Sequence, residues 1–151
     1  ALHSASDFYL WAPLVGATAD GRKRGDELSK NISPVSGRNW AGVTALINSA
    51  LKFDPSLFAA DFPVDLMLHP SALADDEGLE AMYSLLMAYI RGYGHAIQFN
   101  VFDADVLRDA QKHPERYRDL QVRVCGWNVL WNNLNRREQD NYILQAEAHA
   151  C

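Results

Sequence analysis

Toward the C-terminal end of the chain, one short segment brings three reactive groups together. It reads Arg123-Val124-Cys125-Gly126-Trp127, and it therefore combines a guanidinium, a thiol and an α-carbon without a side chain. Glycine tolerates unusual backbone geometry and lets another group approach closely. Within an apolar strand, however, a glycine usually marks a bulge or a tight approach of another backbone. Ordinary packing is thus the simplest interpretation of the pentapeptide alone.

The wider sequence resembles a known family. The pentapeptide, followed by Asn128-Val129-Leu130 and by Gln139-Asp140 in an expected terminal helix, is similar to the glycyl radical fingerprint of pyruvate formate-lyase and its relatives. Further blocks look like family blocks in family order: Gly16-Ala17-Thr18-Ala19-Asp20-Gly21-Arg22, Ile32-Ser33-Pro34-Val35, Thr44-Ala45-Leu46-Ile47-Asn48-Ser49, His95 to Asn100, and Leu107 to Tyr117.

The resemblance implies that Gly126 carries and stores an organic radical. Such a radical is stabilised when the α-carbon is planar and the spin spreads into the flanking amide nitrogen and carbonyl, which glycine permits without strain. In the family, an S-adenosylmethionine-dependent activase with an iron-sulfur cluster removes the hydrogen, so no bound cofactor is expected. The radical then passes to a catalytic cysteine far upstream, on a loop that this sequence does not contain.

The residues around Gly126 have supporting roles in this interpretation. A carbon radical survives only where water and oxygen are excluded. We therefore expect a dry pocket lined by Val124, Trp127, Val129, Leu130 and Trp131.

Two further members of the pentapeptide support the loop in other ways. A charge within an apolar strand is costly unless it is paired, so Arg123 is expected to anchor the loop through a carboxylate or backbone carbonyls. Cys125 matches a place where the family accepts small residues. We interpret it as a small buried side chain, in preference to a catalytic thiol. Trp127 replaces the commoner tyrosine, which weakens any transfer of a particular substrate.

Three functions are compatible with these residues. The first is the radical-bearing part of a lyase or dehydratase that acts only together with the remainder of the enzyme, which carries the catalytic cysteine and forms a homo-oligomer. The second is a stand-alone replacement protein that docks on an oxygen-damaged enzyme of the family. The third is an α/β binding module with a coincidental pentapeptide. The substrate and the bond that is cleaved cannot be read from the sequence.

Composition excludes several partners. The formal net charge of −5 and the pI near 5.4 oppose nucleic-acid binding, which requires clustered basic residues. No apolar run is long enough to cross a membrane. The five histidines lack partners at metal-ligand spacing, and the run Arg22-Lys23-Arg24 suits a solvated loop better than an anion site. Only two cysteines are present, so a reducing cytoplasm is the expected location.

The apolar pattern predicts an α/β fold. Residues 1–40 read as irregular loops, residues 41–119 as alternating helices and strands, and residues 120–151 as the radical loop with a terminal helix opened by an Asn135–Glu138 capping box. Helices are expected over 41–52, over 75–91 with Asp75 or Asp76 as the cap, and over 103–113 with Asp103 as the cap. Strands are expected over 63–70 and 95–102, which can pair in parallel. By resemblance, this is the C-terminal portion of a ten-stranded α/β barrel, so an apolar face is expected to be exposed.

Overall fold

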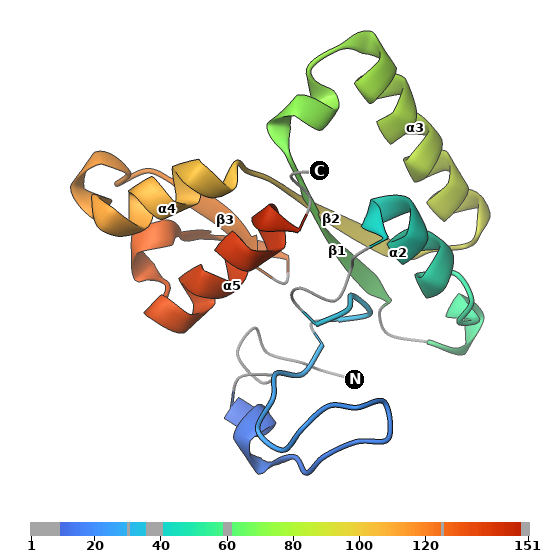
Figure 1. Ribbon diagram of the computed structural model, residues 1–151. Coiled ribbons are helices and arrows are strands. Elements are labelled where there is room, and N and C mark those ends of the chain that lie inside the picture. The colour runs from blue at the N-terminus through green and yellow to red at the C-terminus, as the bar shows by residue number, and fades with distance from the viewer. Residues whose placement is uncertain (1–9, 30, 36–40, 59–61, 125, 149–151) are drawn as a thin grey trace.

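The computed structural model describes residues 10–29, 31–35, 41–58, 62–124 and 126–148. Two pairs of strands are each flanked by helices, and residues 10–29 project from the rest as a short helical turn (Ala12–Leu14) followed by an irregular loop (Figure 1). The helices and strands are α2 (Gly42–Ala50), β1 (Pro63–Leu68), α3 (Asp76–Arg91), β2 (Ala96–Val101), α4 (Ala104–Lys112), β3 (Gln121–Val124), β4 (Trp127–Leu130) and α5 (Arg136–Glu147).

The parallel strands β1 and β2 form the centre of the molecule. Val64 pairs with Ile97 and Leu66 with Phe99. Successive side chains of a strand point to opposite faces, so these four apolar residues share one face, and they pack there with α2 and α3. Met67 lies on the other face and joins the core formed with α4 and α5. Both faces of β1 are therefore covered, as expected for a parallel strand.

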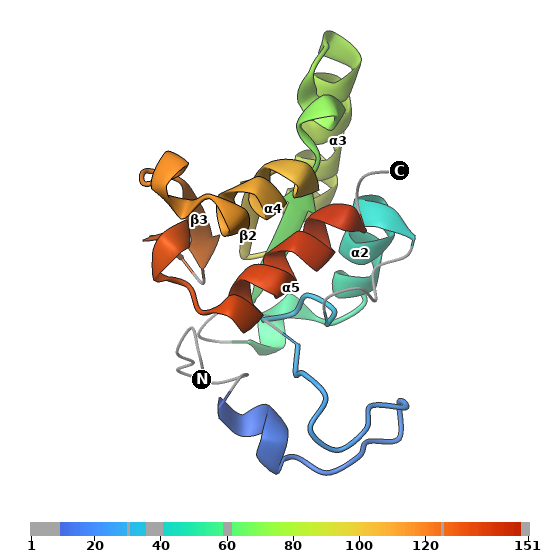
Figure 2. The same ribbon diagram turned by 60° about the vertical axis from the view of Figure 1, so that its left-hand side comes forward.

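A second core lies within the C-terminal third. Leu107 and Ala110 of α4 pack against Tyr142 and Ile143 of α5, with Trp131 buried among them. The helices α4 and α5 lie side by side on the same side of the β1–β2 pair in both views (Figures 1 and 2). The C-terminal hairpin is thereby attached to the central strands through packed side chains.

The helix starts agree with the expected caps. Asp75 accepts a hydrogen bond from the Gly78 amide at 2.8 Å and Asp103 one from the Asp105 amide at 2.7 Å. The Asn135–Glu138 capping box at the start of α5 is complete. Side-chain oxygens at these positions satisfy helix amides that have no partner within the helix. The predicted helices, the two central strands and their parallel pairing are confirmed.

The expected barrel is not present in the described residues. They form two separate two-stranded sheets, β1–β2 and β3–β4. Fewer than the ten strands of a closed barrel are available, so the edges of both sheets stay open. The structure thus supports the α/β class and leaves the barrel as an expectation for a longer protein.

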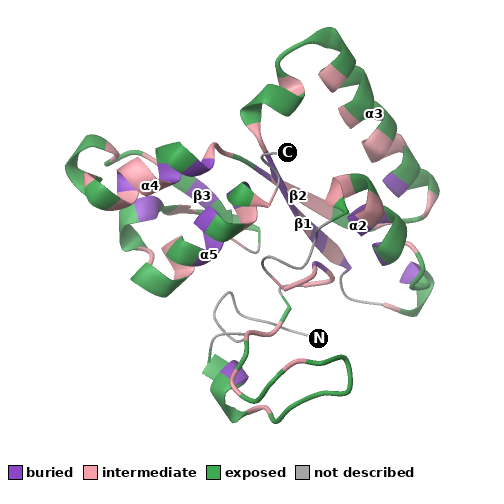
Figure 3. Cartoon of the chain, viewed as in Figure 1, coloured by how far each residue is buried: buried purple, intermediate pink, exposed green. Residues whose placement is uncertain are grey.

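Much of helix α3 is exposed, as Figure 3 shows. Only Tyr89 of this helix is fully buried, and its hydroxyl donates to the Phe62 and Ala96 carbonyls. Leu79, Tyr83 and Ile90 are exposed. Their spacing of four and seven residues places them on one face of the helix, as in a helix that packs on another element. The exposed apolar face was expected at the Gly126 loop and the strands before it, so α3 adds a second apolar surface that the sequence did not predict.

The carboxylate of Asp109 holds the turn after α4, and its contacts make the stability of the chain depend on pH. Asp109 accepts hydrogen bonds from the Tyr117 hydroxyl at 2.7 Å and lies 2.8 Å from His113 Nδ1. The bond from Tyr117, followed by that from His113, lowers the pKa of Asp109 below its ordinary value of 3.8. The same contact with Asp109 raises the pKa of Tyr117 above 10.0.

The sign of the stability change follows from these directions. The folded chain binds the Asp109 proton more weakly than the unfolded chain, so the contribution is present above pH 3.8 and is lost as the pH falls through the lower folded pKa. Asp109→Asn should lower the melting temperature slightly at pH 7, and the difference from wild type should decrease as the pH falls below 3.8. Thermal unfolding followed by circular dichroism measures both. A difference that fails to decrease on acidification would contradict this assignment.

Candidate functional site

Gly126 is a turn residue directly before β4, on the connection from β3 to β4. The strands pair antiparallel, with Val124 opposite Trp127 next to the turn. Gly126 has a φ of +101°, and a Cβ added to it would meet nothing within 4 Å. The backbone conformation, rather than a lack of space, therefore requires glycine here. The α-carbon is exposed at the tip of the hairpin, where another molecule or domain could reach it.

The two faces of the hairpin differ in character. Residues directly opposite each other in an antiparallel pair place their side chains on the same face. Val122 and Val124 face the C-terminal core. Arg123 pairs with Asn128 on the outer face, where its Nη1 donates to Asn128 Oδ1 at 3.1 Å. This exposed side chain thus bonds to an amide among the described residues, and its anchoring by a carboxylate or backbone carbonyls stays a prediction.

Among the described residues, the side chains around Gly126 do not close into a dry pocket. Trp131 is fully buried, but Trp127 is 54% and Leu130 38% exposed. Val124 and Val129 are half-buried. That these five residues line a dry pocket in a longer enzyme therefore stays a prediction. Cys125, predicted to be a small buried side chain, lies outside the described residues.

Side chains of β2 bond to the hairpin backbone. The amide N–H of Gly126 donates to Gln98 Oε1 at 2.9 Å. Asn100, which is buried, accepts from the Arg123 N–H at 2.8 Å and donates to the Arg123 carbonyl at 3.0 Å. Sequence reasoning did not identify either residue. The available signal was that 98 and 100 are polar positions alternating with the apolar Ile97, Phe99 and Val101, which indicates one polar strand face.

The terminal helix α5 holds the other end of the hairpin. The Tyr142 hydroxyl donates to the Arg123 carbonyl at 3.0 Å, and Gln139 Nε2 donates to the Trp131 carbonyl at 3.0 Å. The Asp140 carboxylate accepts a bond from Gln111 of α4 at 2.8 Å. Gln139 and Asp140 belong to the fingerprint, and the structure gives them bonds that join the helix to its neighbours.

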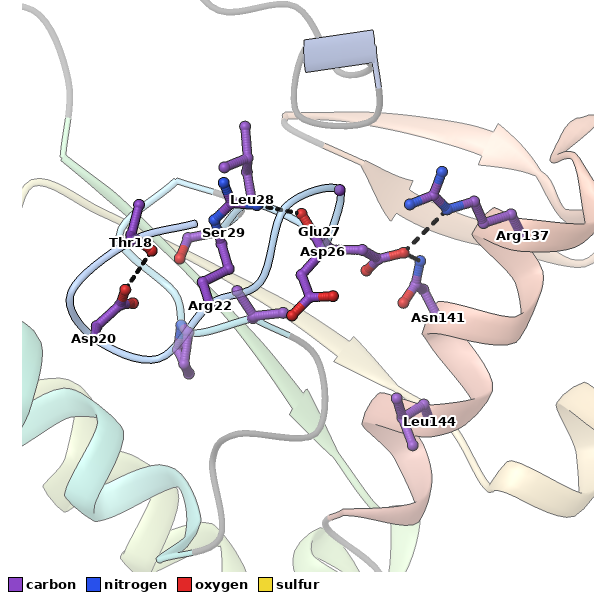
Figure 4. A pocket seen from close by; sticks show the side chains of 13 residues that line it. Thr18, Asp20, Arg22, Asp26, Glu27, Leu28, Ser29, Arg137, Asn141 and Leu144 are labelled. Carbon is purple, nitrogen blue, oxygen red and sulfur yellow. Dashed lines mark hydrogen bonds and ion pairs between the residues drawn. The ribbon is translucent and has the colours of Figure 1, made fainter. Parts of the chain in front are cut away.

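A separate pocket of about 900 Å³ lies between the N-terminal loop and α5 (Figure 4). Arg22 organises the loop by donating to the carbonyls of Gly16, Lys23 and Asp26 at 2.5, 3.1 and 2.7 Å. Glu27 accepts bonds from Arg137 and Asn141 of α5. Arg22 therefore has a structural role in the loop, in agreement with the preference for a loop over an anion site.

The described residues contain no group of three or more histidine, cysteine, aspartate or glutamate side chains that could hold a metal ion. Among the same residues, no helix has the length and apolar character needed to cross a membrane.

The regions that match known proteins include most of the chain. Residues 28–132 match the family model described as "Glycine radical". The chain is 40% identical to an indoleacetate decarboxylase of Tractidigestivibacter scatoligenes. The aligned region makes up 91% of this chain and 16% of that protein. It is also 40% identical to a trans-4-hydroxy-L-proline dehydratase of Clostridioides difficile, and here the aligned region makes up 89% of this chain and 17% of that protein.

Solved structures agree with the sequence matches. The B12-independent glycerol dehydratase of Clostridium butyricum, in its glycerol-bound form, superposes with a TM-score of 0.86 at 38% identity, over 93% of this chain and 18% of that chain. A glycyl radical enzyme of Archaeoglobus fulgidus superposes with a TM-score of 0.81 at 32% identity, over 89% of this chain and 17% of that chain. The chain thus spans less than a fifth of the length of these relatives.

Proposed function

Because this chain belongs to the glycyl radical enzyme family, we propose that it stores a radical on the α-carbon of Gly126 for a lyase or dehydratase. A radical S-adenosylmethionine activase removes one hydrogen atom from that carbon. The stored radical later takes a hydrogen atom from the thiol of a catalytic cysteine in the remainder of the enzyme. The resulting thiyl radical abstracts hydrogen from the substrate and starts bond cleavage.

The conformation of Gly126 is the observation that carries this proposal. Its α-carbon lies at the exposed tip of a hairpin, and its φ of +101° is one that residues with a side chain rarely adopt. Both properties suit a carbon that must be reached first by an activase and later by a thiol. The family model includes this residue, since it extends from 28 to 132.

The exposure of Trp127 and Leu130 supports a partner that covers the hairpin. A radical at the exposed turn would meet water and oxygen, so the protective environment must come from the rest of the enzyme. The relatives are five to six times longer, as the 16–18% coverage indicates. We propose that this remainder supplies both the cysteine and the dry pocket, and that the complete enzyme is a homo-oligomer of the cytoplasm.

Anaerobic incubation of the protein with its cognate activase and S-adenosylmethionine tests the storage role. Electron paramagnetic resonance should show a glycyl signal with a large coupling to the single remaining α-hydrogen. Exposure of the activated sample to air should then cleave the backbone at Gly126, and mass spectrometry should find a C-terminal piece that begins beyond this residue. An activase shown to work on another family member, but giving neither signal nor cleavage here, would refute the storage role.

One further experiment distinguishes the second candidate function, a stand-alone replacement protein, from the enzyme part. Activated chain is mixed with a family enzyme that oxygen has already cut at its own glycine. Restored turnover would support the replacement role, whereas turnover that requires this sequence within a longer polypeptide would support the enzyme part. The comparisons extend over about nine-tenths of the chain, beyond the fingerprint itself, and this extent favours the enzyme part.

A further inference from the structure

The side of β2 that faces the hairpin carries two amides. Ile97 and Phe99 pack toward α2 and α3, so the alternation of a strand places Gln98 and Asn100 on the opposite face. That face is the one on which Met67 of β1 joins the C-terminal core. Amide side chains thus stand where a parallel strand would usually continue its apolar packing.

The side-chain amide of Asn100 bonds to backbone groups of Arg123 that have no partner in strand β4. The pair Arg123–Asn128 lies next to the pair that closes the turn, and in an antiparallel ladder alternate residues direct their N–H and C=O groups away from the partner strand. The Arg123 peptide groups meet the Asn100 amide at 2.8 and 3.0 Å. The strands β2 and β3 belong to separate sheets, so this bidentate contact, with Tyr142, fixes the hairpin against β2.

Gln98 extends the same contact into the turn. Its Oε1 accepts from the Gly126 N–H at 2.9 Å, and its Nε2 lies 3.4 Å from the Arg123 carbonyl. One amide therefore bridges the end of β3 and the glycine itself. Because the Gly126 N–H donates to this side chain, the orientation of its peptide plane depends on residue 98.

We propose that Gln98 is a positioning residue that holds the Gly126 amide in the orientation needed for formation and persistence of the radical. This inference rests on the proposed storage role of Gly126. Two effects follow from the bond. The peptide plane before the α-carbon is held in place, and the acceptor polarises the N–H bond so that the nitrogen donates more electron density toward an electron-poor α-carbon.

The contact also explains why a polar residue stands on this strand face. An acceptor for one backbone amide could equally be a passive tie that only adds stability, because most buried backbone amides have a partner. The two roles predict different outcomes for the radical. A passive tie changes the mobility of the hairpin alone, whereas a positioning residue also changes the yield and the spectrum of the radical.

The test uses the full-length protein that contains this sequence, as wild type, Gln98→Met, Gln98→Glu and Gln121→Met. Methionine keeps the length of the side chain and removes the acceptor, while glutamate keeps an acceptor oxygen at the same place. Gln121 lies exposed at the start of β3, so Gln121→Met is a matched control in the same hairpin. Hydrogen–deuterium exchange of peptides covering residues 121–130 in the unactivated protein reports the bond without any radical chemistry.

Gln98→Met should accelerate exchange of the Gly126 amide about 3- to 10-fold, the range that one neutral hydrogen bond supports. The radical yield after a fixed activation time should fall by a similar factor, and the coupling to ¹⁵N in glycine-labelled protein should decrease. Gln98→Glu should recover most of the yield, and Gln121→Met should match wild type.

Two results would overturn the positioning role. One is a wild-type radical yield and nitrogen coupling in Gln98→Met, which would leave Gln98 as a passive tie even if exchange is faster. The other is a yield in Gln98→Glu as low as in Gln98→Met. Failure of the storage role looks different, because wild type itself then gives no glycyl signal while the exchange experiment still reports the Gln98 contact.

Discussion

Gly126→Ala is expected to abolish the glycyl signal completely while the protein still folds. A Cβ would meet no atom within 4 Å, but the φ of +101° is unfavourable for alanine, so the substitution should cost about 1–3 kcal/mol of stability. The alanine side chain would also crowd a planar α-carbon and hinder hydrogen abstraction. Paramagnetic resonance after activation measures the signal, and urea unfolding measures the stability.

Gly25→Ala is the matched control for this experiment. Gly25 has a φ of +85°, also with nothing within 4 Å of an added Cβ, and it lies in the N-terminal loop away from the hairpin. A similar loss of stability with an undiminished radical signal is expected. If Gly126→Ala keeps the signal, or if Gly25→Ala loses it as completely, Gly126 does not carry the radical.

Trp131→Ala is expected to produce the largest loss of stability. Trp131 is fully buried beside the hairpin, with its ring edge-on to Tyr142 at a centroid distance of 6.3 Å. Removing a large buried aromatic side chain leaves a cavity and costs about 3–5 kcal/mol. Because Trp131 links the end of β4 to α5, the hairpin should also become more mobile. Urea unfolding followed by far-ultraviolet circular dichroism gives the free energy, and hydrogen exchange over residues 121–130 gives the mobility.

Two further variants serve as controls for the stability loss of Trp131→Ala. Trp127→Ala removes the same side chain from an exposed position four residues earlier, so it should change the free energy of unfolding by less than about 1 kcal/mol. Trp131→Phe keeps most of the ring. It should lose less than the alanine variant, because the buried indole N–H has no hydrogen-bond partner among the described residues. Equal losses for Trp127→Ala and Trp131→Ala would contradict the burial on which the prediction depends.

Local signals along the chain were sufficient for the helices. Asp75, Asp103 and Asn135 cap the helices that their positions predicted, because a cap bonds to amides two or three residues away and needs no distant partner. The pattern in residues 63–70 and 95–102 indicated the two central strands for a similar reason, since alternation and flanking prolines are local. The family fingerprint around Gly126 is also continuous in sequence, and the matches to known proteins confirm the family that it indicated.

Exposure and long-range hydrogen bonds could not be predicted from the sequence. The apolar positions of α3 indicated one face, but Tyr89 is covered whereas Leu79 and Ile90 are not, because coverage depends on which other elements are present. The residues expected to shield Gly126 are partly exposed for the same reason. Gln98 and Asn100 were overlooked, since they lie 28 and 23 residues from their partners Gly126 and Arg123.

The primary structure was enough to identify the family, the helix caps and the α/β class, since each depends on residues close together along the chain. Folding in three dimensions was needed to show that the Gly126 amide is held by Gln98, that Asn100 clamps the Arg123 peptide, and that the hairpin is open on its outer side. The physical reason is range. Conformational preferences act over a few residues, whereas a hydrogen bond or a water-free surface depends on groups that only the packed chain brings together.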